Sequence, residues 1–254
     1  MKLDFSKKVV LVTGSSRGIG LGIGKLFIKL GAKVIFNSRN HDDLTKLIKK
    51  LDTPKAIGVV SDVTCPKSSR NLIEEVFHKH GPINNIICNV GSGKSCKPGQ
   101  ENFEEWQRVF ELNLWSTTNI VESSKDFFVK EGGAITCISS ICGKEYIPGA
   151  PVTYSVAKAA LNSYVKSISL PLSKKGIRIN VITPGNILFE GSVWDEKMKK
   201  DLDQLNKFIS NEVPLGRLGN VEDVAYFCVW LSSEYASFIT GNQFNVDGGQ
   251  TRSF

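Results

Sequence analysis

The sequence predicts an α/β protein with a doubly wound, seven-stranded parallel sheet in a single domain of 254 residues. Short apolar runs alternate with longer helix-like segments, these runs are continuous in Val and Ile, and a glycine-rich turn follows the first of them. Continuous apolar runs are typical of parallel strands because helices cover both faces of such a sheet. With 41% hydrophobic residues, the chain is apolar enough for one full core.

Seven apolar runs are the predicted strands, and each is separated from the next by a stretch that accommodates a helix. They cover residues 9–12, 33–37, 56–61, 85–89, 134–138, 178–182 and 243–246. The two longest predicted helices span about residues 101–130 and 152–174. Each right-handed crossover places a helix after its strand, and ligands of such folds bind at the carboxyl ends of the strands. The least regular stretch, about residues 185–214, is predicted to be a flap over that edge, with a plain surface helix as the alternative.

The turn after the first strand reads Thr13-Gly14-Ser15-Ser16-Arg17-Gly18-Ile19-Gly20 and opens a helix-like segment. Glycines permit the sharp turn and let a ligand approach the backbone closely. The unpaired N–H groups and the positive dipole end of a helix attract a pyrophosphate. The turn therefore predicts a dinucleotide site, and a tight strand-to-helix turn without a ligand is the alternative.

Tyr154 and Lys158 are four residues apart in a predicted helix, so their side chains share one face. A nearby cation favours the phenolate, so Lys158 is expected to lower the pKa of Tyr154 from about 10, unless the pair only decorates a helix surface. Ser139 and Ser140 follow the fifth strand, where Ser140 suits a substrate carbonyl and Ser139 a turn or cap. Asn113 needs a partner if buried, and we expect it to hold a water near Lys158 or to satisfy a backbone carbonyl.

Composition argues against several other classes of protein. The histidines His78 and His80 lie two apart and the six cysteines form no Cys-x-x-Cys pair, so free thiols and no metal site are expected. The net charge of +7 is spread along the chain, which favours anionic small molecules and argues against nucleic acid. No apolar run approaches the ~20 residues of a membrane span and no signal peptide is visible, so we expect no membrane partner and a cytoplasmic location.

Together these motifs resemble the short-chain dehydrogenase/reductase family, and its 3-oxoacyl-(acyl-carrier-protein) reductases in particular, from about Lys7 to Gly249. The resemblance implies a Rossmann fold and an NADP(H)-dependent oxidoreductase that moves hydride between nicotinamide and a carbonyl or secondary alcohol. The family's catalytic tetrad falls on Asn113, Ser140, Tyr154 and Lys158. It implies Tyr154 as the acid/base, Ser140 as the group that polarises the oxygen, Lys158 on the nicotinamide ribose, and Asn113 on a proton-relay water.

The resemblance also implies a set of cofactor-binding residues. They are Gly14, Ser16, Arg17, Gly18, Ile19, Gly20, Ser38, Arg39, Asp62, Val63, Asn89, Val90, Gly91, Tyr154, Lys158, Pro184, Gly185 and Ile187. Ser38 and Arg39 stand where NAD-preferring members carry an acid, and Arg17 approaches from the other side, so NADP(H) is expected over NAD(H). The alternative is that both arginines are ordinary surface charges.

Three residues depart from the family pattern. Cys88 replaces an asparagine, Val90 replaces an alanine, and Phe189 replaces a threonine expected near the pyrophosphate. Two other functions stay open: a nucleotide-sugar epimerase or dehydratase, which usually has a longer C-terminal substrate domain, and a non-catalytic NADPH-binding sensor or scaffold.

The family resemblance further implies a homotetramer in which the two long helices pair between subunits. Apolar positions that support it are Trp106, Phe110, Trp115, Phe127, Leu161 and Val165, although ordinary core packing also explains them. The substrate stays open among a 3-oxoacyl thioester, a sugar derivative and a small ketone. Its candidate lining residues are Ser92, Gly93, Lys94, Ile141, Tyr146, Pro148, Phe189, Trp194 and Met198.

Overall fold

The computed structural model describes residues 3–253, so residues 1, 2 and 254 of the predicted domain lie outside the described part. Seven strands form one sheet in the order β3-β2-β1-β4-β5-β6-β7, and every neighbouring pair of these strands is parallel. The strands are β1 (Val9–Val12), β2 (Lys33–Ser38), β3 (Ala56–Val60), β4 (Asn85–Cys88), β5 (Gly133–Ile138), β6 (Ile177–Pro184) and β7 (Gln243–Val246). The predicted doubly wound α/β fold is confirmed.

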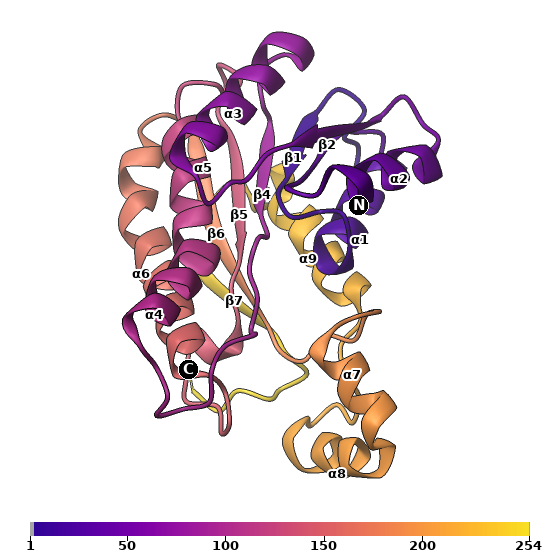
Figure 1. The fold of residues 1–254 in the computed structure, drawn as a ribbon. Coiled ribbons are helices and arrows are strands. Elements are labelled where there is room, and N and C mark those ends of the chain that lie inside the picture. The colour runs from indigo at the N-terminus through magenta and orange to yellow at the C-terminus, as the bar shows by residue number, and fades with distance from the viewer. Residues whose placement is uncertain (1–2, 254) are drawn as a thin grey trace.

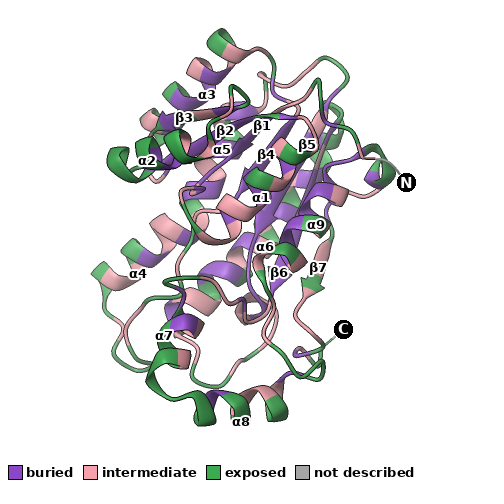
Figure 2. Cartoon of the chain, turned by 90° about the vertical axis from the view of Figure 1, so that its right-hand side faces the viewer, coloured by how far each residue is buried: buried purple, intermediate pink, exposed green. Residues whose placement is uncertain are grey.

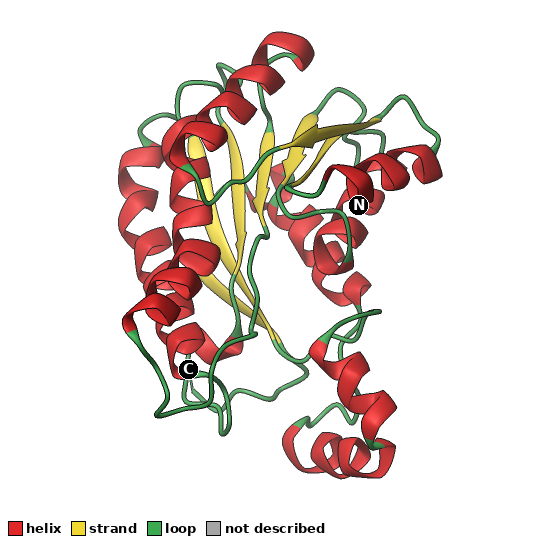
Figure 3. Cartoon of the chain, in the orientation of Figure 1, coloured by secondary structure: helices red, strands yellow, loops and turns green. Residues whose placement is uncertain are grey.

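Helices cover both faces of the sheet (Figure 1 and Figure 3). The helices are α1 (Gly18–Lys29), α2 (His41–Leu51), α3 (Pro66–His80), α4 (Phe103–Phe110), α5 (Ser116–Ser124), α6 (Val152–Ser173), α7 (Val193–Lys200), α8 (Leu202–Glu212) and α9 (Val221–Leu231). Short turns are the π-helical η1 (Glu111–Trp115) and the 3-10 turns η2 (Ile141–Gly143) and η3 (Glu234–Ala236).

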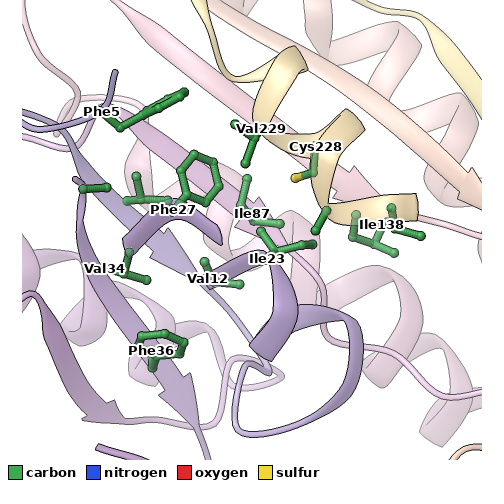
Figure 4. Packing of buried hydrophobic residues seen from close by; sticks show 14 of the residues in the cluster. Phe5, Val12, Ile23, Phe27, Val34, Phe36, Ile87, Ile138, Cys228 and Val229 are labelled. Atoms are coloured by element: carbon green, nitrogen blue, oxygen red, sulfur yellow. The ribbon is translucent and has the colours of Figure 1, made fainter. Parts of the chain in front are cut away.

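Two apolar cores lie on the two faces of the sheet. Val10 and Val12 of β1 point into one core with α1 and α9, whereas Leu11 points into the other with α3, α5 and α6. Figure 4 shows the first core, where Phe27 and Ile23 of α1 meet the strands and α9. Successive side chains of a strand alternate between faces, so both kinds of position must be apolar when both faces are covered. This explains the continuous Val and Ile runs.

The predicted helix over residues 101–130 is wrong as a single element. The chain forms α4, then the π-helical turn η1, then α5, which ends at Ser124. Beyond it, the backbone runs beside the residue that leads into β4: the N–H of Ile83 bonds the carbonyl of Phe127, and the N–H of Val129 bonds the carbonyl of Ile83. Phe127 also packs on Phe77 of α3, with ring centroids 5.3 Å apart. This long-range pairing removes the last residues from the helix.

The stretch 185–214 is more regular than expected, because most of it forms α7 and α8. Ser192 caps α7 by accepting a hydrogen bond from the N–H of Asp195, and Asp201 caps α8 by accepting one from the N–H of Gln204. The two helices lie beyond the carboxyl end of the sheet, and Figure 2 shows most of α8 exposed, whereas the central strands β1, β4, β5 and β6 are mostly buried. The segment therefore stands at the edge where the predicted site lies.

Candidate active site

A cleft of about 770 Å³ opens at the carboxyl end of the sheet. Its lining includes Ser140, Tyr154 and Lys158, together with all the predicted cofactor residues except Gly20. Asn113 also lies outside the lining. Residues that are far apart in the chain thus meet at one edge, because the parallel strands that precede them all end there.

The start of α1 has the features of an anion-binding site. Its first turn holds no acidic residue, and the side chain of Arg17, at the N-cap, makes no capping hydrogen bond. The first N–H groups of the helix and its positive dipole end therefore face the cleft without a protein partner from the cap. Gly18 adopts a φ of +56°, and the ring of Phe189 lies so close that an added Cβ would be 2.7 Å from it. Phe189, the departure from the family pattern, therefore covers the glycine turn with an apolar ring.

Asn89 holds the glycine turn against the end of β4. Its Nδ2 donates to the carbonyls of Thr13 at 3.1 Å and Gly14 at 2.9 Å, and its backbone N–H donates to the Thr13 hydroxyl at 3.0 Å. Gly20 lies beneath this clamp, where an added Cβ would be 2.5 Å from Asn89 Nδ2. A glycine at position 20 thus permits close packing against Asn89 and the backbone of the turn, and it does not line the cleft.

The departures after β4 have different consequences. Cys88 points into the core beside Cys137 of β5, and the contact with that thiol, together with burial, raises the pKa of Cys88. Val90 instead packs on the glycine turn, because a Cβ at Gly14 would lie 2.8 Å from its Cγ2. The thiol therefore replaces an amide in the core, whereas the larger Val90 shapes the cleft wall.

The glycine turn and the end of β2 each present a cation to the cleft. Arg17 and Arg39 are exposed and line it, and no ion pair among the described residues engages either of them. Ser38 is buried and accepts a hydrogen bond from the N–H of Asn40 at 3.1 Å. Asp62 lies across from them, where its Oδ1 accepts hydrogen bonds from the N–H and hydroxyl of Thr64. Two uncompensated guanidinium groups flanking a hydroxyl suit a phosphate.

Tyr154, Ser140 and Lys158 converge at the centre of the cleft. Tyr154 lies in the first turn of α6, and Lys158, one turn further, has its Nζ 5.9 Å from the centre of the Tyr154 ring. Lys158 is only 2% exposed, its Nζ donates to the carbonyl of Ile138 at 3.0 Å, and burial lowers its pKa to about 8. The predicted juxtaposition of these side chains is thus present in the structure.

The expected lowering of the Tyr154 pKa is wrong for this structure. Burial raises the pKa of Tyr154 more than the hydrogen bond with Ser140 lowers it. The site therefore holds Tyr154 as a neutral phenol at neutral pH. The shift is upward because removing the phenolate from water outweighs the neighbouring polar groups.

Ser139 and Ser140 have different partners. The Ser139 hydroxyl donates to the carbonyl of Lys158 at 3.4 Å, which ties β5 to α6. The Ser140 hydroxyl caps η2 by accepting from the N–H of Cys142 at 3.2 Å, and it also bonds Tyr154. Of the two serines, Ser140 is therefore the one whose hydroxyl contacts the Tyr154 phenol.

Asn113 is fully buried in η1, and its side chain bonds backbone groups. Its Oδ1 accepts from the N–H of Ser92 at 2.9 Å, while its Nδ2 donates to the carbonyls of Ser92 at 3.2 Å and Val109 at 3.0 Å. These contacts match the backbone-satisfying alternative. Gly91 permits this arrangement, since a Cβ there would lie 2.9 Å from Asn113 Oδ1 and 3.0 Å from Lys158 Nζ.

We call the part of the cleft that is lined by the loops after β4 and β5 and by α7 and α8 its substrate half, because most of the predicted substrate-lining residues belong to these segments. Seven of the nine candidate lining residues reach it; Tyr146, which is 84% exposed, and Met198 do not. Lining residues that the sequence analysis did not single out include Arg108, Cys142, Lys197, Phe208 and Gln250. Lys197 follows Trp194 by three residues on α7, so the two side chains share a helix face. Since Trp194 was a predicted lining residue, this spacing could have identified Lys197 as another.

The described residues contain no helix that is long and apolar enough to cross a membrane. Nor do residues 3–253 bring three or more His, Cys, Asp or Glu side chains together in a group that could hold a metal ion.

The parallel sheet, the anion-binding turn and the Tyr154–Lys158 pair together define an α/β enzyme of the dinucleotide-binding oxidoreductase class. The chain matches the family described as enoyl-(acyl carrier protein) reductase over residues 14–251. It belongs to this family, a group of short-chain dehydrogenases/reductases, and the resemblance inferred from the motifs is confirmed.

Relatives and solved structures match the chain over nearly its whole length. It is 32% identical to glucose 1-dehydrogenase 2 of Bacillus subtilis over 99% of this chain and 97% of the relative. It is 34% identical to a 3-oxoacyl-(acyl-carrier-protein) reductase of Chlamydia muridarum over 95% and 96% of the two chains. The structure of L-sorbose reductase from Gluconobacter frateurii, complexed with NADPH and L-sorbose, superposes with a TM-score of 0.92 at 29% identity and covers 100% of both chains.

Proposed function

We propose that this enzyme transfers hydride between NADP(H) and a carbonyl or secondary alcohol, with Tyr154 as the acid/base. The observation that carries the proposal is the meeting of Tyr154, Ser140 and Lys158 in the cleft that also contains the glycine turn. The similarity to dehydrogenases and reductases, including a reductase complexed with NADPH, supports it.

The chemistry of reduction follows from the protonation state of these side chains. The nicotinamide supplies the hydride when it is bound. Tyr154, whose pKa burial raises, is a neutral phenol that donates its proton to the carbonyl oxygen as negative charge develops there. Ser140 donates a second hydrogen bond to that oxygen, and the ammonium of Lys158 stabilises the phenolate that is left. In alcohol oxidation the same groups act in reverse.

Asn113 acts in this proposal as a positioning residue. Its side chain fixes the backbone of Ser92 on both the N–H and the carbonyl side, beside Gly91 and Lys158. It therefore holds the loop after β4 at the distance that the cofactor and Lys158 require.

The proposed cofactor is NADP(H), because two cations without ion-pair partners at one end of the cleft suit a phosphate group that NAD(H) lacks. Arg17 and Arg39 lack acidic partners among the described ion pairs, and Ser38, the last residue of β2, lines the same cleft. The 2′-phosphate of NADP(H) is the group that two guanidinium side chains and a hydroxyl fit at this end of the sheet.

Replacing Tyr154 with Phe tests the acid/base assignment. The variant lacks one hydroxyl, so we expect an intact fold and cofactor affinity but a turnover lower by at least 100-fold, because general acid catalysis contributes about 10²–10⁴-fold. NADPH oxidation is followed at its absorbance over panels of ketones, sugars and acyl thioesters.

Tyr146→Phe is the matched control, since Tyr146 is exposed and lies outside the cleft lining. A Tyr154→Phe variant that keeps more than a tenth of the wild-type rate would refute the assignment. NADPH binding without turnover on any panel would instead favour a sensor or scaffold.

We also propose a homotetramer and a cytoplasmic location. Exposed apolar side chains lie on and beside α5 and α6, namely Trp115, Val152, Val156 and Leu170, and association would cover them. The six cysteines are free, as expected in a reducing compartment.

A further inference from the structure

Two aromatic rings and a cation form one surface of the cleft. Trp194 of α7 and Phe208 of α8 are stacked, with ring centroids 5.0 Å apart and an interplanar angle of 28°. Lys197 Nζ lies 4.2 Å from the centre of the Trp194 ring and 5.9 Å from that of Phe208. All three side chains line the same cleft as Tyr154. We refer to Trp194, Lys197 and Phe208 as the aromatic–lysine surface.

The charges that line the cleft are strongly unequal. Its cationic residues are Arg17, Arg39, Lys94, Arg108, Lys158 and Lys197, and its acidic lining residue among the described residues is Asp62. A cleft lined by one sign of charge concentrates ligands of the other sign. Such a lining therefore attracts anions well beyond the cofactor's phosphates.

Most of these cations already have an assigned partner. Arg108 donates two hydrogen bonds to the carboxylate of Glu105, and Lys94 forms an ion pair with Glu196 at 3.1 Å. Lys158 bonds the Ile138 carbonyl beside the phenol. Arg17 and Arg39 belong to the phosphate end of the cleft.

None of the described ion pairs gives Lys197 a carboxylate. Its helix neighbour Lys199 is paired with Asp195, whereas Lys197 rests on two aromatic faces. Such a contact holds the ammonium in place while leaving its charge uncompensated. Lys197 is thus a positioned, unneutralised cation in the substrate half of the cleft.

We propose that the substrate of this enzyme is an anionic carbonyl compound, whose carboxylate or phosphate group binds Lys197. The remainder of the substrate lies against the Trp194 and Phe208 rings while its carbonyl reaches Tyr154. This inference rests on the proposed function and adds the class of substrate to it.

The test uses pairs of carbonyl substrates that differ only in charge: a keto acid with its methyl ester, and a phosphorylated keto sugar with its unphosphorylated form. The wild-type enzyme with NADPH is expected to favour the anionic member in kcat/KM. Lys197→Gln is expected to raise KM for that member about 10- to 100-fold, the equivalent of one charge-assisted hydrogen bond, with kcat within threefold. The neutral member should change less than twofold.

Lys200→Gln is the matched control, because Lys200 ends the same helix and lies outside the cleft lining. It makes the same change of net charge and should leave both members of each pair unaffected. Equal effects of Lys197→Gln on neutral and anionic members, or equal effects of the two lysine variants, would overturn the inference.

Failure of the proposed function gives a different result. In that case neither member of any substrate pair is turned over. Binding is then measured instead, by calorimetric titration of the wild type and of Lys197→Gln with the keto acid and with the phosphorylated sugar, each in the presence of NADPH. Binding that weakens about 10-fold or more in Lys197→Gln alone supports the anion site even then. Undetectable or unchanged binding overturns it.

Discussion

Arg17 and Arg39 are the side chains to which we assign the proposed preference for NADP(H). Both are exposed, so neither contributes to the core, and both line the cleft without an acidic partner among the described ion pairs. Two cations at this position bind a 2′-phosphate by charge-assisted hydrogen bonds, whereas a carboxylate there would bind the two ribose hydroxyls and repel the phosphate. We therefore expect the cofactor preference to depend on the few side chains at the end of β2 and in the glycine turn.

The double substitution Ser38→Asp with Arg39→Ala is expected to reverse the preference from NADPH to NADH. Loss of one charged contact costs about 1.5–3 kcal/mol, so affinity for NADPH should fall about 10- to 100-fold. The measurement is kcat/KM for both cofactors in wild type and variant. A wild-type enzyme with equal kcat/KM for NADH and NADPH would show that the arginines do not recognise the 2′-phosphate.

At the level of elements, a carboxylate network joins the loop after β4 to α4 and α6. Glu105 of α4 accepts hydrogen bonds from the Ser95 hydroxyl, the N–H of Cys96 and the Arg108 guanidinium. The Ser95 hydroxyl is also 2.6 Å from that of Thr153, the residue before Tyr154. The network therefore ties the loop after β4 to the start of the helix that carries Tyr154.

This network predicts a pH-dependent contribution to stability. Hydrogen bonds from Arg108 and Ser95 lower the pKa of Glu105 to about 2 in the folded protein, from 4.5. Because the folded value is the lower one, the contribution is fully present above pH 4.5 and is lost as the pH falls toward 2. The Arg108 side chain is 50% exposed, so solvent screens its ion pair with Glu105. The pair therefore contributes about 1 kcal/mol to the free energy of unfolding.

Glu105→Gln should therefore lower the free energy of unfolding at pH 7 by about 1 kcal/mol. At pH 3 the difference from wild type should shrink, because Glu105 of the unfolded chain, with its ordinary pKa of 4.5, is then largely protonated, and this stabilises the unfolded state. Denaturant unfolding at the two pH values measures both quantities. Glu104→Gln on the exposed side of α4 is the control, and an equal loss at both pH values would contradict the assignment.

The molecule as a whole presents exposed apolar side chains on one helical layer. Trp115 is 41% exposed, Val156 of α6 is 44% exposed and Leu170 is 68% exposed. Leu161 and Val165, which the sequence also offered for an interface, are core residues packed on the sheet. The surface open to another subunit is therefore narrower than the apolar pattern of α6 predicts.

We expect light scattering at micromolar concentration to give about four times the chain mass of 27.9 kDa. Val156→Glu should lower this mass, because a carboxylate in an apolar contact is costly to bury. Leu170→Glu, further along α6, tests whether the contact covers the whole helix. A wild-type mass of one chain would contradict the tetramer.

Local sequence was sufficient for much of this molecule. The run in β1 is apolar at every position and that in β5 at most of them, because both faces of a parallel sheet are covered, and this made the strands visible. Tyr154 and Lys158 share a helical face by spacing alone. The break in the helix after Phe110 was not visible, because η1 and the end of α5 depend on Asn113 bonding Ser92 and on pairing beside Ile83.

The sequence by itself determined the fold class, the glycine turn and the residues of the proposed catalytic cluster, since each depends on period, turn chemistry or spacing within a short segment. Tertiary structure decided the direction in which the pKa of Tyr154 shifts, because burial is a property of the assembled site. It also decided that Asn113 lies behind the cleft and that Lys197 faces into it without a carboxylate. These outcomes depend on neighbours distant in sequence, whose contacts arise only when the strands and helices pack.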